Sequence, residues 1–146
     1  MLNNKKVFPY LLLAGQLIGM LSVIPMIMFG SGWQWLITMG MYCFFMISIT
    51  VGYHRLISHK AFKCPKPIHN LLMVGGGLPF YGPAIVWVAN HREHHRYADT
   101  SLDPHSPWYK GIFKAYFLQV LAPIKFKYVR DLLRKNIYRD QVKYYW

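Results

Sequence analysis

The 47 residues of segment 7–53 contain no aspartate, glutamate, lysine or arginine. A soluble domain of this size rarely has so long a gap, because its helices need a polar face toward water. About 20 apolar residues cross a bilayer as a helix, so the segment is too long for one span and suits two. It predicts an integral membrane protein and argues against a soluble globule, a disordered tail and a secreted disulfide scaffold.

Two spans joined by a short turn fit this segment. We expect the first span over residues 8–29, the turn at residues 30–32 and the second span over residues 33–53. The turn carries no charge, whereas basic residues flank both outer ends. Because basic residues favour the cytoplasmic side, we expect a hairpin with both ends in the cytoplasm, in a bacterial inner membrane or the endoplasmic reticulum.

The strongly basic composition could suggest a nucleic-acid partner, since the formal net charge is +12. However, two basic residues precede the apolar segment and the other fifteen follow it. Basic residues that flank apolar spans are explained by the membrane itself and its anionic lipids. We therefore expect membrane lipid, and no nucleic acid, as a partner.

Two later segments also bear on the architecture. Residues 67–90 are poor in charge, but several glycines and prolines, including the run 75–77, are expected to break any regular helix there. Basic residues lie on both sides, so we predict a segment that does not cross the membrane. Residues 125–143 carry seven basic and two acidic residues, with apolar residues at helical spacing. They predict either a basic amphipathic helix on the membrane or a helix packed on a protein core.

All seven histidines lie between His54 and His105, and five of them form two compact groups. Positions i, i+3 and i+4 share one face of an α-helix, so the second group would direct three imidazoles into one volume. The five-residue step of the first group would separate its two rings by roughly 140° on an ideal α-helix. Imidazole is a common ligand of transition metals. We expect five metal ligands: His54, His59, His91, His94 and His95.

The two remaining histidines, His69 and His105, are expected to be structural. The five predicted ligands can form one centre only if both groups lie on the same side of the membrane. This requirement agrees with a segment 67–90 that returns to its starting side.

The residues around the two groups resemble a known family. Residues 52–62, GYHRLISHKAF, are similar to the first histidine box of membrane fatty acid desaturases of the acyl-CoA and acyl-lipid Δ9 type. Residues 87–100, WVANHREHHRYADT, resemble the second box, and residues 103–107, DPHSP, resemble the string that follows it. The resemblance implies an all-α integral membrane fold, in which a transmembrane hairpin precedes a cytosolic or interfacial helical region carrying both boxes.

The resemblance also implies an activity. Desaturases of this type use a non-haem di-iron centre, O2 and electrons from a ferredoxin or cytochrome b5 type donor. They introduce a cis double bond, here expected at Δ9, into a fatty acyl-CoA or acyl-lipid. Trp87, just before the second box, is expected either to contact the acyl chain or to serve in packing or as an interface anchor. The same boxes occur in lipid hydroxylases and ketolases, and an inactive metal-binding membrane remnant is a further alternative.

The resemblance does not extend to the third histidine box of the family, since no histidine follows His105. We therefore expect residues 1–146 to be a single desaturase-like domain that is incomplete at its C-terminus. Its parts would be the hairpin (7–53), the histidine-box region (54–107) and an amphipathic basic region (108–146). A C-terminal partner polypeptide would then supply the third box.

Overall fold

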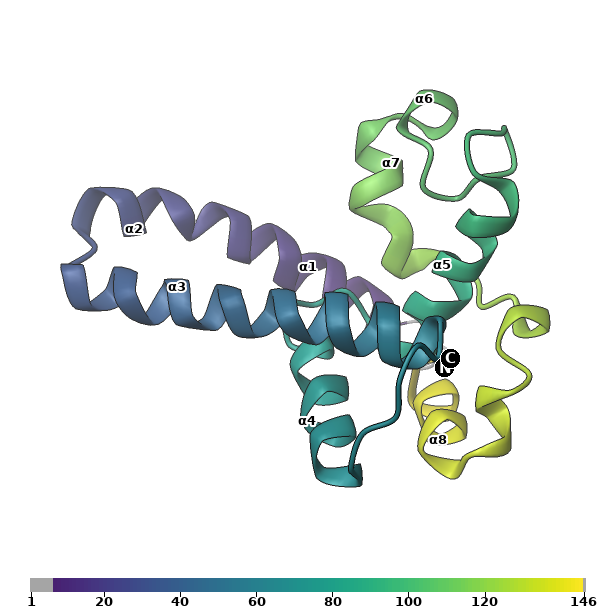
Figure 1. Ribbon diagram of the computed structural model, residues 1–146. Helices are drawn as coiled ribbons and strands as arrows, with labels where there is room; N and C mark the ends of the chain where they lie inside the picture. The colour runs from purple at the N-terminus through teal and green to yellow at the C-terminus, as the bar shows by residue number, and fades with distance from the viewer. Residues whose placement is uncertain (1–6, 146) are drawn as a thin grey trace.

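The computed structural model describes residues 7–145, without the side chain of residue 144, and its regular structure is entirely helical. Figure 1 shows two long helical limbs that lie side by side and project from a head of shorter helices. The two limbs correspond to the two predicted spans. The predicted all-α class with an N-terminal helical hairpin is confirmed for the described residues.

The first limb consists of helices α1 (Val7–Leu21) and α2 (Val23–Phe29), which are separated at Ser22. The separation lies just before Pro25. Proline has no N–H to donate, and its ring crowds the carbonyl of the residue four positions earlier, which here is the last residue of α1. Together the two helices cover 23 residues and are long and apolar enough to cross a membrane.

The second limb begins with a capped helix and ends as a π-helix. At its start, Gln34 N–H donates to Ser31 Oγ at 3.4 Å, and Ser31 N–H donates to Gln34 Oε1 at 2.7 Å. Helix α3 (Gly32–Ile47) then continues into the π-helical segment η2 (Ser48–Ser58). The predicted end at residue 53 lies inside this limb, so the first histidine group belongs to the limb rather than following it.

Many apolar side chains on the two limbs point away from the protein. Phe29 is 77% exposed and Trp33 is 69% exposed, and both lie near the tip of the hairpin. Exposed apolar surface of this extent is unfavourable in water but suits contact with lipid. Among the described residues, only the two limbs have the length and apolar composition of a span.

Helix α4 (Lys66–Gly77) passes through the glycine run that was expected to interrupt it. A Cβ added to Gly75 would lie 2.3 Å from Ser48 Oγ, and one added to Gly76 would lie 2.5 Å from the ring of Tyr53. The predicted break within residues 67–90 is confirmed, because a non-helical turn follows Gly77, but the glycine run itself lies inside α4, where it allows close packing against the second limb. The helix ends only after them, in a turn where Gly82 has a φ of +89°.

Helix α5 (Ala84–Tyr97) is the centre of the head. Its residues Ile85, Val86 and Val88 are at most 1% exposed, and the helix packs against η2 and against the last helix of the chain. The second histidine group is therefore carried by a helix whose N-terminal half is packed in the core. Short helices follow: α6 (Pro107–Lys110), α7 (Ile112–Tyr116), η3 (Leu118–Leu121), η4 (Phe126–Tyr128), η5 (Leu132–Arg134) and α8 (Asn136–Tyr145).

The basic region 125–143 is not one continuous helix, as both interpretations of the sequence required. It consists of η4, η5 and α8 separated by non-helical residues such as Lys135, whose ψ is 132°. Val129 is fully buried and Leu132 is 5% exposed in the core. The apolar residues therefore pack on the protein, as the second interpretation expected, and this packing breaks the helix into short pieces.

Candidate metal centre

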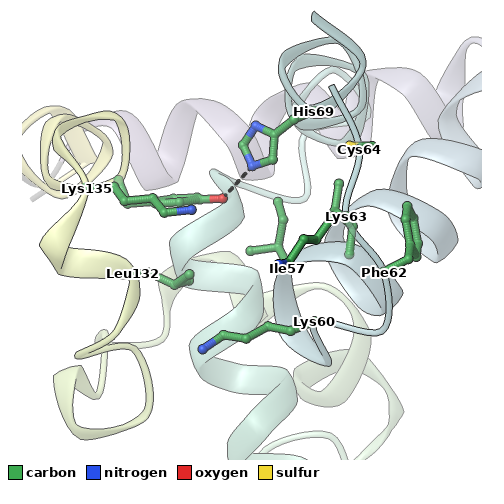
Figure 2. Close-up of a pocket in the computed structure, with 10 residues that line it drawn as sticks. Ile57, Lys60, Phe62, Lys63, Cys64, His69, Leu132 and Lys135 are labelled. Carbon is green, nitrogen blue, oxygen red and sulfur yellow. Dashed lines mark hydrogen bonds between the residues drawn. The ribbon is translucent and has the colours of Figure 1, made fainter. Parts of the chain in front are cut away.

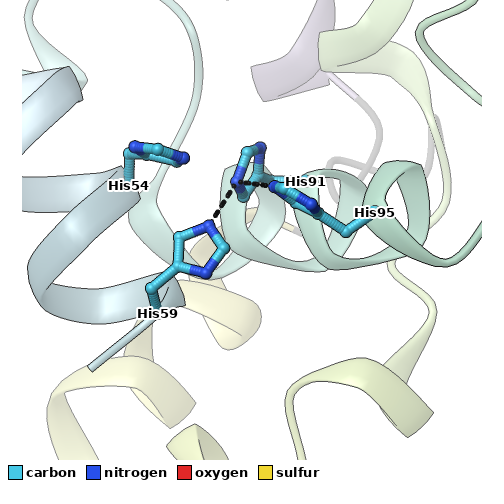
Figure 3. A group of neighbouring side chains, drawn as sticks. All are labelled: His54, His59, His91 and His95. Carbon is cyan, nitrogen blue, oxygen red and sulfur yellow. Dashed lines mark hydrogen bonds between the residues drawn. The ribbon is translucent and has the colours of Figure 1, made fainter. Parts of the chain in front are cut away.

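Four of the five predicted ligands lie together at the end of the second limb. Figure 3 shows two histidines from the limb facing two histidines from α5. One nitrogen of each ring lies within 4.8 Å of the corresponding nitrogens of the others. The four residues are His54, His59, His91 and His95. The fold thus brings the two histidine groups, 32 or more residues apart in sequence, into one cluster.

The ring of His91 lies between two others. Its Nε2 is 3.1 Å from Nε2 of His59 and 3.0 Å from Nε2 of His95. Imidazole nitrogens bind a transition metal at about 2.1 Å, so two adjacent ligands of one ion are about 3 Å apart. These two separations fit ligands of one ion, and the all-nitrogen donor set of the cluster suits iron, zinc, copper or nickel.

The π-helical end of the second limb explains how His54 and His59 meet. In a π-helix the backbone bond runs over five residues, and the N–H of His59 donates to the carbonyl of His54 at 3.0 Å. The two residues are therefore one turn apart, and their ring centroids are 4.6 Å apart. The divergence of roughly 140° expected for an α-helix was wrong, because this part of the helix is not an α-helix.

The second group follows ordinary α-helical geometry. His91 and His95 are four residues apart on α5, and their ring centroids are 4.5 Å apart. His94 lies outside the cluster of four. Its Nδ1 contacts both carboxylate oxygens of Asp103 at 2.9 Å, and its ring lies 5.5 Å from that of His105. The structure therefore divides the predicted ligands into four plus one.

The side chain of Arg92, a residue of the second histidine group, contacts the backbone of the helix that carries the first group. Its guanidinium donates to the carbonyl of Ser58 at 2.9 Å and to that of Ile57 at 3.2 Å, both at the end of η2. It also donates to the carbonyl of Tyr128 at 2.7 Å and to the carboxylate of Asp131 at 2.8 Å. A residue of the second group thus caps the helix that carries the first group.

Asp131 is held between two cations. Lys60 Nζ lies 2.6 Å from its carboxylate, opposite the guanidinium of Arg92. Partial burial by itself raises the pKa of Asp131, but the hydrogen bonds from these two cations outweigh it and hold that pKa well below its usual value. The carboxylate is therefore ionised near neutral pH and fixes the side chain of Arg92.

His91 and His95 favour their neutral forms. Burial, followed by the neighbouring His95 and the other rings of the cluster, lowers the pKa of His91 to about 3. Burial and adjacent histidines also lower the pKa of His95. Only the neutral ring has a lone pair for a metal, so these ligands are ready to bind at neutral pH without first losing a proton.

Asp103 is buried but remains an acceptor. Its side chain is 1% exposed, and burial acts to raise its pKa. The contact with His94 and the backbone N–H groups of His105 and Asp99 outweigh the burial, so the pKa of Asp103 stays below its usual value. Contact with a carboxylate favours a proton on Nδ1 of His94, which leaves Nε2 as the nitrogen with a free lone pair.

Trp87, predicted to contact an acyl chain, lies beside the cluster. Its ring stacks on His91 with centroids 4.6 Å apart and planes 19° apart, and it also packs near Tyr53. This position borders the candidate metal centre.

Residues outside the cluster of four have other partners. His69 lies on α4, where its Nε2 is 2.9 Å from the hydroxyl of Tyr138, in accord with a structural role.

Sequence reasoning did not single out Arg92 or Asp131. Their distance in sequence hides their contact, although the position of Arg92 between two predicted ligands was an available signal.

Comparison with known proteins identifies the family. The family model described as "Fatty acid desaturase" matches residues 31–146. This range includes the second limb, the head and the whole histidine cluster. The chain belongs to the fatty acid desaturase family. No solved structure matches the chain.

Several curated desaturases are similar to parts of this family member. A probable chloroplastic lipid desaturase of Arabidopsis thaliana is 51% identical over 61 residues, covering 42% of this chain and 17% of the relative. An acyl-CoA Delta(11) desaturase of Trichoplusia ni is 37% identical over 99 residues, covering 66% of this chain and 28% of the relative. An sn-2 palmitoyl-lipid 9-desaturase of Nostoc is 38% identical over 101 residues, covering 63% of this chain and 35% of the relative. The chain thus matches about a third or less of each relative.

The family and the structure together indicate two properties. Desaturases of this family are membrane proteins, and the two limbs have the length and composition of spans, so the chain is membrane-associated. The family and the four clustered imidazoles indicate metal binding.

Proposed function

We propose that this chain is the N-terminal part of a non-haem di-iron fatty acyl desaturase. The observation that carries the proposal is the cluster of four imidazoles, drawn from both histidine boxes, at the end of a membrane-length helix. A metal centre at this position lies where an acyl chain in the bilayer can reach it. In the proposed reaction, –CH2–CH2– of the acyl chain, O2, two electrons and two protons give –CH=CH– and two water molecules.

The donor set fits iron. The cluster of four provides nitrogen ligands, two pairs of which have separations suited to one ion, and iron is among the metals that imidazole binds. Bound iron together with O2 supplies the oxidising power needed to remove hydrogen from an unactivated methylene group. The protein supplies the orientation of the ligands.

His94 is assigned to the second iron in this proposal. Asp103 orients its ring and directs Nε2 away from the carboxylate. The remaining ligands would come from a third histidine box outside these 146 residues, on a longer chain or on a C-terminal partner polypeptide. All five predicted ligands thus have a role, divided between two ions.

The substrate and the electron source follow from the relatives. Named relatives act on acyl-CoA and on acyl-lipids, so we propose one of these as substrate, with a double bond at Δ9. Trp87, stacked on His91, would contact the acyl chain beside the metal centre. A ferredoxin or cytochrome b5 type protein would donate the electrons, and both ends of the hairpin would face the cytoplasm.

Lipid profiling of a host that lacks Δ9 desaturase activity tests this function. The chain is expressed alone, with a C-terminal polypeptide carrying a third histidine box, and with that partner but with His91→Ala. His69→Ala is the matched control, because His69 lies outside the cluster. New mid-chain double bonds in the paired wild type and in the control, and their absence with His91→Ala, support desaturation. Oxygenated lipids would instead indicate a hydroxylase or ketolase, and an unchanged profile would contradict the proposal.

A further inference from the structure

A basic groove lies on the head beside the end of the second limb, separate from the histidine cluster. Figure 2 shows one part of it, a hollow of about 410 Å³ between the segment after η2, α4 and the segment leading into α8. A neighbouring hollow of about 530 Å³ shares Cys64, His69 and Lys135 with it. The two hollows therefore form one continuous groove.

Four lysines line this groove, and no acidic side chain among the described residues does. They are Lys60, Lys63, Lys66 and Lys135. Lys60 is paired with Asp131, but the ion pairs of the described residues include none of the other three. The floor is apolar, with Ile57 and Leu132 at its base. The groove therefore combines uncompensated positive charge with an apolar surface.

Two helix N-termini add to the positive potential of the groove. Helix α4 begins at Lys66 and helix α8 begins at Asn136, and both residues line the second hollow. Neither helix has an acidic residue in its first turn. The positive ends of both helix dipoles thus reinforce the lysines, and such sites favour phosphate groups.

The position of the groove favours a lipid over a soluble ligand. Its first lysine follows the end of the membrane-length limb by two residues, which places the groove at the level of the membrane surface. Helix α4 also exposes a row of apolar side chains on another face, about 140° around the helix from the face that lines the groove, which suits contact of α4 with the bilayer: Ile68 (48% exposed), Leu71 (57%) and Val74 (58%).

We propose that this groove binds the phosphate headgroup of an anionic phospholipid. Lys63, Lys66 and Lys135 hold the phosphate. The lipid would anchor α4 and α8 to the membrane surface, and its binding requires neither a metal nor the proposed desaturase reaction.

Lipid binding to the purified full chain in detergent tests the proposal. The probes are phosphatidylglycerol, phosphatidylcholine and glycerol 3-phosphate, and binding is measured by native mass spectrometry and by the shift in melting temperature. The test variant is Lys63→Gln with Lys135→Gln, which leaves the ion pair of Lys60 intact. The matched control is Lys110→Gln with Lys114→Gln, which removes the same charge from the segment of α6 and α7. A third variant, Lys63→Arg with Lys135→Arg, keeps the charge.

We expect phosphatidylglycerol to bind more tightly than phosphatidylcholine, and glycerol 3-phosphate to bind weakly. Loss of two lysines should weaken phosphatidylglycerol binding by about thirtyfold, whereas the control and the arginine variant should bind nearly as the wild type does. Equal weakening in the control pair would show general charge attraction and overturn the groove as the site. Equally tight binding of glycerol 3-phosphate would overturn the lipid as its occupant.

Discussion

The two histidine boxes reach the same cluster through two different helices. In the first box the ligands are five residues apart on a π-helical end of an exposed limb; in the second they are four apart on a buried α-helix. Each spacing is one turn of its own helix. The comparison teaches that ligand spacing must be interpreted together with the helix type, and that Arg92 joins the two supports.

The largest expected effect comes from removing the ligand between the two boxes. Because Nε2 of His91 lies within 3.1 Å of a ring nitrogen from each box, His91→Ala should weaken metal binding by about a hundredfold or more. Metal titration of the purified chain measures this loss. His69→Ala should bind metal as the wild type does, and an equal loss there would indicate general unfolding.

Arg92→Ala should separate the two boxes while leaving all ligands present. The backbone carbonyls of Ile57, Ser58 and Tyr128 would lose their donor, whereas Asp131 keeps Lys60, so we expect a loss of about 2 kcal/mol in the free energy of unfolding. Thermal unfolding in detergent provides the measurement. Arg92→Lys keeps the charge but not the forked donor, so its melting temperature should lie between those of the wild type and of Arg92→Ala. A wild-type melting temperature in Arg92→Ala would rule out the connection.

The long charge-free segment was sufficient to predict the hairpin, because few structures other than membrane spans accommodate 47 uncharged residues. The meeting of His54 and His59 could not be predicted, since no residue between them signals a π-helix. Glycines 75–77 were interpreted as breakers because their close contacts with the limb depend on tertiary packing. For the same reason, the pattern at Val129 and Leu132 was consistent with a helix but could not show how burial divides it.

Asp103→Asn should distinguish His94 from the cluster of four. The carboxylate contacts only His94 among the predicted ligands, so metal affinity of the cluster of four should change less than about twofold. With a third-box partner, loss of this orienting carboxylate should lower activity about ten- to hundredfold. Metal titration and lipid profiling together measure the difference. Equal loss in both assays would contradict the division into four plus one.

A smaller effect is expected from pH. The pKa of His91 in the folded protein is about 3, below the ordinary value of 6.5, so the unfolded chain binds its proton more readily. The metal-free protein should therefore lose stability as the pH falls from about 6.5 toward 3. Melting temperatures between pH 7 and 4 would show a decline in the wild type and a shallower one in His91→Gln. Parallel curves would exclude His91 as a source of the decline.

X-ray absorption spectroscopy of the iron-loaded full chain tests the central claim most directly. We expect one tightly bound ion per chain whose first shell contains four imidazole nitrogens, two from each box. His94→Ala should leave this signature unchanged, whereas replacement of any member of the cluster of four should remove one imidazole from it. An iron shell with fewer than four imidazoles, or one that depends on His94, would contradict the account.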